Sequence, residues 1–191
     1  MPRGEFIGGD WGTSRLRLYL CDEALEIIDV QVGPGAAAAR GHYETMLDSL
    51  IANWAGASSG IPVVLCGMVG SSIGWVETPY ANCPVHPEAL AKACVPLKNG
   101  RVHVVPGLAC RNRFEAPDVM RGEETQVLGA LQRLPELGSG QRLLCLPGTH
   151  TKWVMLSDGT FSNFRTPPVP KLYYALSRYT ILFSDAGASR M

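Results

Sequence analysis

The stretch FIGGDWGTSRLRLYL, residues 6–20, decides the fold because it places a glycine-rich turn between two strand-like segments. Residues 6–10 form a short apolar strand. Residues 15–20 alternate polar and apolar side chains, which is the period of a half-buried strand. A third strand is predicted at residues 26–32, so the chain is expected to open with a three-stranded meander.

Beyond this meander, helical and strand-like patterns alternate. A helix is predicted at residues 42–54, where apolar side chains recur at three- and four-residue steps. Residues 62–66 are continuously apolar, as expected for a strand buried on both faces. Further helices are predicted at residues 87–93 and 123–134, and further strands at residues 102–105, 143–146 and 153–156.

The order of these elements is that of an RNase H-like α/β domain with a mixed sheet. We expect a first domain over residues 1–138 and, over residues 139–191, the start of an incomplete second domain of the same kind. A Gly-Thr turn lies between two predicted strands at residues 12–13 and again at residues 148–149. A repeated turn of this kind is expected of a duplicated fold.

Composition and charge exclude several classes of protein. Lys and Arg total 17 and Asp and Glu total 17, so no electrostatic footprint for nucleic acid or an anionic membrane is present. No apolar stretch approaches the ~20 residues that span a bilayer, and no signal-peptide core is visible. The six cysteines lack a C-x-x-C pair and indicate reduced thiols. We expect a cytoplasmic protein that binds neither nucleic acid nor membrane.

The first turn carries residue types that suit a phosphate group. Glycine lets backbone N–H groups approach phosphate oxygens closely, so Gly12, Thr13 and Ser14 are candidate phosphate ligands. Asp10 is suited to hold a magnesium ion through water, and Arg15 offers a cation to the transferred group. The motif alone leaves open a plain β-hairpin whose Asp and Thr satisfy the turn backbone.

The second turn repeats this chemistry and supplies five candidate phosphate ligands: Gly148, Thr149, His150, Thr151 and Lys152. It combines two hydroxyls with one cation. A phosphate chain held between two such hairpins, one per domain, is the hypothesis that joins the motifs. The alternative is a hydroxyl-rich β-turn, in which His150 forms turn hydrogen bonds rather than acting as a base.

Paired carboxylates open the helix predicted at residues 123–134. Acidic residues in a first helical turn commonly interact only with the helix dipole. A carboxylate at a helix start can also orient and deprotonate an attacking hydroxyl in phosphoryl transfer. Glu123 is the first candidate for this base and Glu124 the second. Arg121 is a candidate for binding a sugar-acid carboxylate or the moving phosphoryl group.

The loop after the buried strand lies where open α/β sheets bind ligands. Hydroxyls, exposed backbone and an indole suit a small polyhydroxylated substrate. The alternative is a Gly/Ser loop with the indole as its packing anchor. Residues 75–80 are expected to line or cover the same pocket. The candidate substrate-binding residues are Gly67, Met68, Ser71, Ser72, Gly74 and Trp75.

Four motifs in order resemble the 2-dehydro-3-deoxygalactonokinase family of the sugar kinase/actin/Hsp70 superfamily: DWGTSR (10–15), GMVGSSIGWVETPY (67–80), DVMRGEETQ (118–126) and PGTHTKWV (147–154). The resemblance runs from about residue 5 to about residue 160. It implies an actin-like ATPase fold. It also implies a kinase that uses ATP and Mg²⁺ to phosphorylate the 6-hydroxyl of 2-dehydro-3-deoxy-D-galactonate in galactonate catabolism.

The resemblance also places the site. It puts Asp10, Gly12 and Thr13 on the first phosphate motif and residues 148–151 on the second. It puts the sugar-side segment, within a sugar-binding first domain, at residues 67–75. The assignment of the base to Glu123 rests on superfamily analogy.

The sequence departs from the family after Phe164. A Thr-Gly-Glu-like helix entry is expected there, but residues 167–170 contain three prolines, which cannot continue a helix or a central strand. Since family members are longer, we expect a C-terminally truncated chain.

Two alternatives are a non-catalytic sugar-acid-binding fragment or pseudokinase, and a phosphohydrolase or ATPase on the same fold. An uncovered apolar edge would favour a homo-oligomer.

Overall fold

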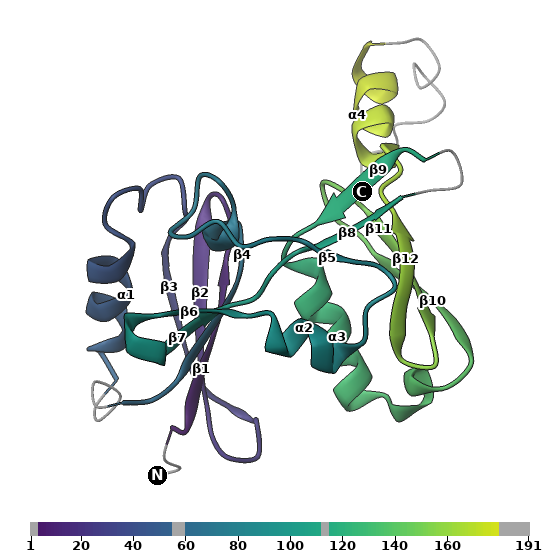
Figure 1. The fold of residues 1–191 in the computed structure, drawn as a ribbon. Coiled ribbons are helices and arrows are strands. Elements are labelled where there is room, and N and C mark those ends of the chain that lie inside the picture. The colour runs from purple at the N-terminus through teal and green to yellow at the C-terminus, as the bar shows by residue number, and fades with distance from the viewer. Residues whose placement is uncertain (1–3, 55–59, 112–114, 180–191) are drawn as a thin grey trace, which may run out of the picture.

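The computed structural model describes residues 4–54, 60–111 and 115–179 of the 191-residue chain. It has a mixed α/β architecture in which two groups of elements lie side by side (Figure 1). Among the residues described, none of the helices has the length and apolar run that crossing a bilayer requires.

The first group is built on a six-stranded mixed sheet with the order β3-β2-β1-β4-β7-β6. Its strands are β1 (Phe6–Trp11), β2 (Arg15–Cys21), β3 (Ile27–Pro34), β4 (Val63–Gly67), β6 (Val95–Leu97) and β7 (Val102–Val104). The predicted meander is confirmed, because β1 pairs antiparallel with β2, and β2 with β3. On its other side β1 pairs in parallel with β4, from Ile7 opposite Val63 to Trp11 opposite Gly67.

Strand alternation and helix periodicity together make the first core. Ile7 and Trp11 of β1 and Leu18 of β2 point to one face of the sheet and are fully buried. Helix α1 (Tyr43–Ile51) covers this face with side chains spaced four residues apart, including the buried Leu47. The helix predicted at residues 42–54 is therefore present and ends a turn earlier.

The second group contains α2 (Pro87–Lys92), α3 (Glu123–Arg133) and two three-stranded sheets. One sheet has the order β5-β8-β9, with β5 (Ala81–Asn82), β8 (Leu108–Arg111) and β9 (Pro117–Met120). The other is an antiparallel meander of β10 (Gln141–Leu146), β11 (Lys152–Ser157) and β12 (Thr160–Arg165). Short 3-10 turns are η1 (Met68–Gly70), η2 (Lys98–Gly100) and η3 (Pro135–Gly138). Helix α3 lies between the six-stranded sheet and β10-β11-β12 (Figure 1).

The first core draws on residues 7–104 and the second on residues 81–164, so the two overlap in sequence, and the boundary predicted at residue 138 stays a prediction. The second core packs Leu90 of α2 and Leu108 of β8 against Val127 of α3 and Phe161 of β12. Residues 81–90, which precede strands β6 and β7 of the first sheet, therefore bury apolar side chains in the second core.

Helix α4 (Val169–Tyr179) follows the proline-rich segment. Two prolines precede the helix and Pro170 lies in its first turn, where the missing N–H costs no intrahelical hydrogen bond. Figure 1 shows α4 extending away from the rest of the second group. Its side chains Leu172, Tyr173 and Tyr174 are exposed.

Candidate functional site

A cavity of about 250 Å³ lies where the ends of β1 and β10 meet the start of α3; we call it the junction cavity. It is lined by Asp10, Arg121, Gly122, Glu123, Gln126, Leu146, Pro147, Gly148, Thr149 and His150. The strand end before the first Gly-Thr turn therefore shares one cavity with the second Gly-Thr turn, although the two are far apart in the sequence.

Asp10 is the only residue of the first motif that lines the junction cavity. Its backbone is fixed between Arg17 of β2 and Cys66 of β4, and its half-exposed carboxylate lies 3.6 Å from the guanidinium of Arg17. The described residues contain no group of three or more His, Cys, Asp or Glu side chains placed to hold a metal. A single accessible carboxylate nevertheless fits Mg²⁺, which retains waters and phosphate oxygens as its other ligands.

The turn after Asp10 is braced from behind, and its side chains lie outside the junction cavity. The carbonyl oxygens of Gly12 and Thr13 accept hydrogen bonds from the N–H groups of Ala36 and Ala37, at 2.9 and 3.1 Å. The side chains of residues 13–15 are exposed, and residues 12–15 do not line the cavity. The cavity therefore gives no support to phosphate contacts by Gly12, Thr13, Ser14 and Arg15, and their predicted role stays a prediction.

The two carboxylates at the head of α3 point to different places. Glu123 lines the junction cavity, and its Oε2 accepts a hydrogen bond of 3.1 Å from the backbone N–H of Arg121. Glu124 is fully buried, and both its oxygens accept from the backbone N–H of Gly122, at 2.7 and 2.8 Å. Only Glu123 is therefore placed to meet a ligand in the cavity.

Burial changes the acid–base behaviour of the groups beneath the cavity. It raises the pKa of Glu124 to about 7, and the neighbouring charge of Glu123 acts in the same direction. The hydrogen bonds from the backbone at residues 122 and 124 oppose this rise. Burial also raises the pKa of the Cys66 thiol to about 12, so this thiol stays protonated at neutral pH.

Arg121 is held in place by Thr78 and Tyr80, two residues of the segment 75–80. Its guanidinium donates to the hydroxyl of Thr78 and, at 3.0 Å, to the carbonyl oxygen of Thr78. It also stacks over the ring of Tyr80, 4.3 Å from the centroid. Its Nε is buried and has no hydrogen-bond partner. Thr78 and Tyr80 thus position a cation at the cavity wall. The sequence indicates their role only through the expectation that residues 75–80 line the pocket.

The predicted sugar-side loop is divided between two places. Gly67, with φ of +89°, packs its backbone against Trp11 and lies close to the carboxylate of Asp10. Gly74 and Trp75 instead line a separate cavity of about 500 Å³ with residues 40–45, and Trp75 stacks on Tyr43 with ring centroids 6.3 Å apart. The indole therefore serves as a packing anchor on its inner face.

The other loop residues make local contacts or face solvent. The Ser71 hydroxyl donates to the carbonyl oxygen of Met68 at 2.7 Å, and Ser72 is exposed. Substrate contacts by Met68, Ser71 and Ser72 thus stay a prediction without a shared cavity behind them.

Gly148, Thr149 and His150 line the junction cavity, whereas the last two residues of the second motif do not. The Thr151 hydroxyl donates to the carbonyl oxygen of Gly148 at 3.3 Å, which closes the turn. All three cavity-lining residues are exposed, so their backbone and side-chain donors are accessible to a ligand.

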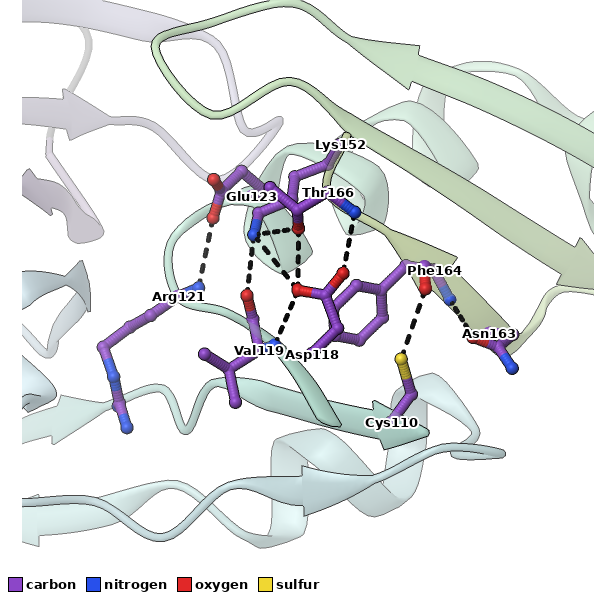
Figure 2. A network of polar contacts seen from close by, with 9 residues as sticks. All are labelled: Cys110, Asp118, Val119, Arg121, Glu123, Lys152, Asn163, Phe164 and Thr166. Atoms are coloured by element: carbon purple, nitrogen blue, oxygen red, sulfur yellow. Dashed lines mark hydrogen bonds and ion pairs between the residues drawn. The ribbon is translucent and has the colours of Figure 1, made fainter. Parts of the chain in front are cut away.

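Lys152 does not line the junction cavity, and its predicted phosphate role stays a prediction that the cavity does not support. Its side chain is buried, and its Nζ donates to the carbonyl oxygen of Val119 and the hydroxyl of Thr166, both at 2.6 Å. Asp118 accepts from the N–H and hydroxyl of Thr166 and lies 3.9 Å from Nζ. Figure 2 shows this network, with the guanidinium of Arg121 pointing away from it. Lys152 therefore anchors the strand after the turn.

Comparison with known proteins adds a family description to this geometry. Residues 10–191 match the family described as 2-keto-3-deoxy-galactonokinase. The chain is 38% identical over 183 residues to the Rhizobium meliloti (strain 1021) protein named "Probable 2-dehydro-3-deoxygalactonokinase DgoK1". It is 31% identical over 179 residues to the 2-dehydro-3-deoxygalactonokinase of Escherichia coli (strain K12). These matches cover 94% and 93% of this chain and 58% of each relative.

A solved structure from a relative is also similar to this chain in its fold. The structure described as "Crystal structure of a putative 2-dehydro-3-deoxygalactonokinase protein from Sinorhizobium meliloti" matches this chain with a TM-score of 0.81 at 36% sequence identity. The match covers 93% of this chain and 58% of that protein. The chain thus spans 58% of the length of each of these relatives.

Proposed function

Because this chain belongs to the 2-keto-3-deoxygalactonokinase family, we propose that it provides the phosphate-transfer cavity of an ATP-dependent sugar-acid kinase. The proposed reaction transfers the terminal phosphoryl group of ATP to the 6-hydroxyl of 2-dehydro-3-deoxy-D-galactonate. The observation that carries this proposal is the junction cavity, where one carboxylate from β1, one from α3 and a Gly-Thr turn meet. The strand order of the first sheet supports an actin-like ATPase fold for the kinase.

Asp10 is proposed to orient the metal–nucleotide complex. Bound Mg²⁺ would neutralise charge on the phosphate oxygens during transfer. The backbone of Asp10 is held at the end of a central strand by pairing on both sides, so the attachment point of its carboxylate is fixed before ligand binds. Such preorganisation avoids a reorganisation cost at the moment of reaction.

Glu123 is proposed as the general base. Its carboxylate is directed into the junction cavity by a hydrogen bond from the N–H of Arg121 and can accept the proton of the attacking hydroxyl. Glu124 is the weaker candidate, because both of its oxygens are used to hold the N–H of Gly122.

Arg121 and the second turn are proposed to bind the two anionic ends of the reactants. The guanidinium of Arg121, fixed by Thr78 and Tyr80, suits the carboxylate of a sugar acid. The glycine of the turn at residues 148–150 leaves backbone N–H groups accessible to phosphate oxygens. The proposed partners are therefore two small molecules, ATP and a sugar acid.

An assay for ADP release tests this proposal. The 191-residue chain is co-expressed with the part of the Sinorhizobium meliloti relative that it does not match, and ATP, Mg²⁺ and 2-dehydro-3-deoxy-D-galactonate are supplied. We expect ADP release that requires both Mg²⁺ and the sugar acid and that is absent with an analogue lacking the 6-hydroxyl. ADP release independent of the sugar acid would identify an ATPase instead.

Calorimetry on the 191-residue chain separates the second candidate. A non-catalytic sugar-acid-binding module would bind the sugar acid and give no heat with ATP and Mg²⁺. Binding of the nucleotide, abolished by Asp10→Asn, supports the kinase.

A further inference from the structure

Two glycines lie between the two carboxylates of the junction cavity. Gly67 ends β4 and Gly122 is the N-cap of α3, and both have a positive φ, +89° and +109°, that favours glycine. A Cβ atom built on Gly122 would lie 3.4 Å from the Cα of Gly67. The start of α3 therefore lies against the end of β4 with no side chain between the two backbones.

The contact continues from Gly67 to Asp10. A Cβ atom built on Gly67 would lie 3.3 Å from Oδ1 of Asp10 and 3.0 Å from the carbonyl oxygen of Trp11. The carboxylate of Asp10, the backbone of Gly67 and the start of α3 thus form one series of contacts. Because Glu123 follows directly after this helix start, the spacing between the carboxylates of Asp10 and Glu123 depends on the series.

Glu124 fixes the helical end of the series. Its side chain is fully buried, and both its oxygens accept from the backbone N–H of Gly122, at 2.7 and 2.8 Å. An acidic side chain in the first turn that reaches back to the N–H of the N-cap residue is an established way to fix a helix start. Glu124 therefore holds the backbone that carries Glu123 without lining the cavity itself.

The next residue of α3 adds a link to the same strand. Thr125 forms a side-chain hydrogen bond with Cys66, the residue before Gly67. Cys66 lies opposite Asp10 in the parallel pairing of β4 with β1. Two consecutive side chains of α3 thus act at the end of β4, next to the strand that carries Asp10.

We propose that Glu124 is a positioning residue: it holds the start of α3 against the end of β4 and thereby fixes the spacing between the two carboxylates of the junction cavity. It acts through the backbone of Gly122 and touches neither reactant. The roles of Asp10 and Glu123 rest on the proposed function, whereas the contact between α3 and β4 does not. Phosphoryl transfer depends on such spacing, since a misplacement of about 1 Å can reduce a rate by about 10²-fold.

Turnover by the co-expressed kinase tests the consequence for the reaction. Glu124→Ala removes the acceptor for the N–H of Gly122 and should reduce kcat by about 30-fold, while both KM values change by less than about threefold. Glu124→Gln should keep kcat within a few-fold of the wild type, because its amide oxygen can still accept. Val127→Ala provides the control, since it removes buried packing from the same helix; its unfolding midpoint should fall and its kcat should not.

Alkylation of the 191-residue chain tests the contact without turnover. Cys66 lies beside the contact and Cys110 lies in the second core, and each is 7% exposed. The rate at Cys110 therefore reports opening of the fold as a whole. Glu124→Ala should raise the alkylation rate of Cys66 relative to that of Cys110 by about tenfold, whereas Glu124→Gln and Val127→Ala should leave this ratio unchanged.

Three results would overturn the inference. One is an unchanged kcat in Glu124→Ala. Another is an equal loss of kcat in Glu124→Ala and Glu124→Gln, because the proton of the carboxyl would then matter rather than its hold on Gly122. The third is an unchanged ratio of Cys66 to Cys110 alkylation in Glu124→Ala. If the wild-type kinase releases no ADP, the proposed reaction fails, and this ratio still decides whether Glu124 holds the contact.

Discussion

The two meanders share a connection and differ in their surroundings. Both place a Gly-Thr turn between their first and second strands. In β1-β2-β3 the first strand is central in a six-stranded sheet and α1 covers one face. In β10-β11-β12 the first strand is an edge and one apolar face is exposed. The strand end before the first turn therefore lines the junction cavity from the middle of a sheet, whereas the second turn lines it from a sheet edge.

This difference indicates which wall of the junction cavity is fixed before a ligand binds. Asp10 and Glu123 are held by backbone pairing and by a helix start, whereas residues 148–150 are exposed on a turn after β10, which among the described residues is paired on one edge only. Substitutions on the two walls should therefore have unequal effects, and the following experiments measure that inequality.

The largest effect is expected from Asp10→Asn. Loss of the carboxylate removes the proposed magnesium contact and should reduce kcat/KM of the co-expressed kinase by about 10³-fold. Thr149→Val on the other wall should cost only about tenfold, because neighbouring N–H groups still contact phosphate. Steady-state ADP release measures both variants. Equal losses would show that the two walls are equally preorganised.

The pair Glu123→Gln and Glu124→Gln comes next. Glu123→Gln should reduce kcat by about 10²-fold because it removes the proposed base, while its unfolding midpoint stays unchanged. Glu124→Gln should change kcat only a few-fold, since the amide oxygen can still accept from the N–H of Gly122. Single-turnover kinetics compare the two. A larger loss with Glu124→Gln would reassign the base.

Glu124 should also give a pH dependence of stability. Its pKa is about 7 in the folded chain and near 4.5 when unfolded, so the folded state binds more protons between these values. The free energy of unfolding should therefore fall by about 3 kcal/mol as the pH rises through this window. Glu124→Gln should lose this slope and be the more stable protein at pH 8.

Urea unfolding at several pH values of the wild type and Glu124→Gln provides the measurement. The difference between the two proteins isolates Glu124 from other titrating groups. Parallel curves would show that this carboxyl does not keep its proton in the folded state.

The smallest effect is expected from Lys152→Met. The change leaves Asp118 and the carbonyl oxygen of Val119 without their cation and should destabilise the chain by about 2 kcal/mol. Lys92→Met, at an exposed position on α2, should change stability by less than about 0.5 kcal/mol. Thermal unfolding compares them. No difference would indicate that Lys152 is not held as the structure describes.

The elements that the sequence predicts well are those with a strong local period. The alternation in β2 and the four-residue spacing in α1 arise from burial of one face, and such patterns are visible without knowledge of the fold. The short strands β5 and β9 have no comparable pattern, because their pairing depends on partners distant in the chain. The sequence therefore predicts five of the six strands of the first sheet, without β6, and does not predict the sheet β5-β8-β9.

The burial of two candidate site residues had a signal in the sequence. Lys152 lies two and four residues before the buried Val154 and Leu156, so strand alternation places its side chain inward. Glu124 precedes Val127 and Leu131 at helical spacing, so it lies on the buried face of α3. The stacking of Arg121 on Tyr80 had no such signal, because it joins separate loops.

The network around Asp118 has a mechanical consequence. Asp118 accepts two hydrogen bonds from Thr166, which lies just before α4. Asp118 itself lies three residues before Arg121. Force applied to the protruding α4 would therefore reach the cavity wall through one side chain and a short stretch of backbone. A partner that bound α4 and displaced it would therefore also displace the guanidinium of Arg121.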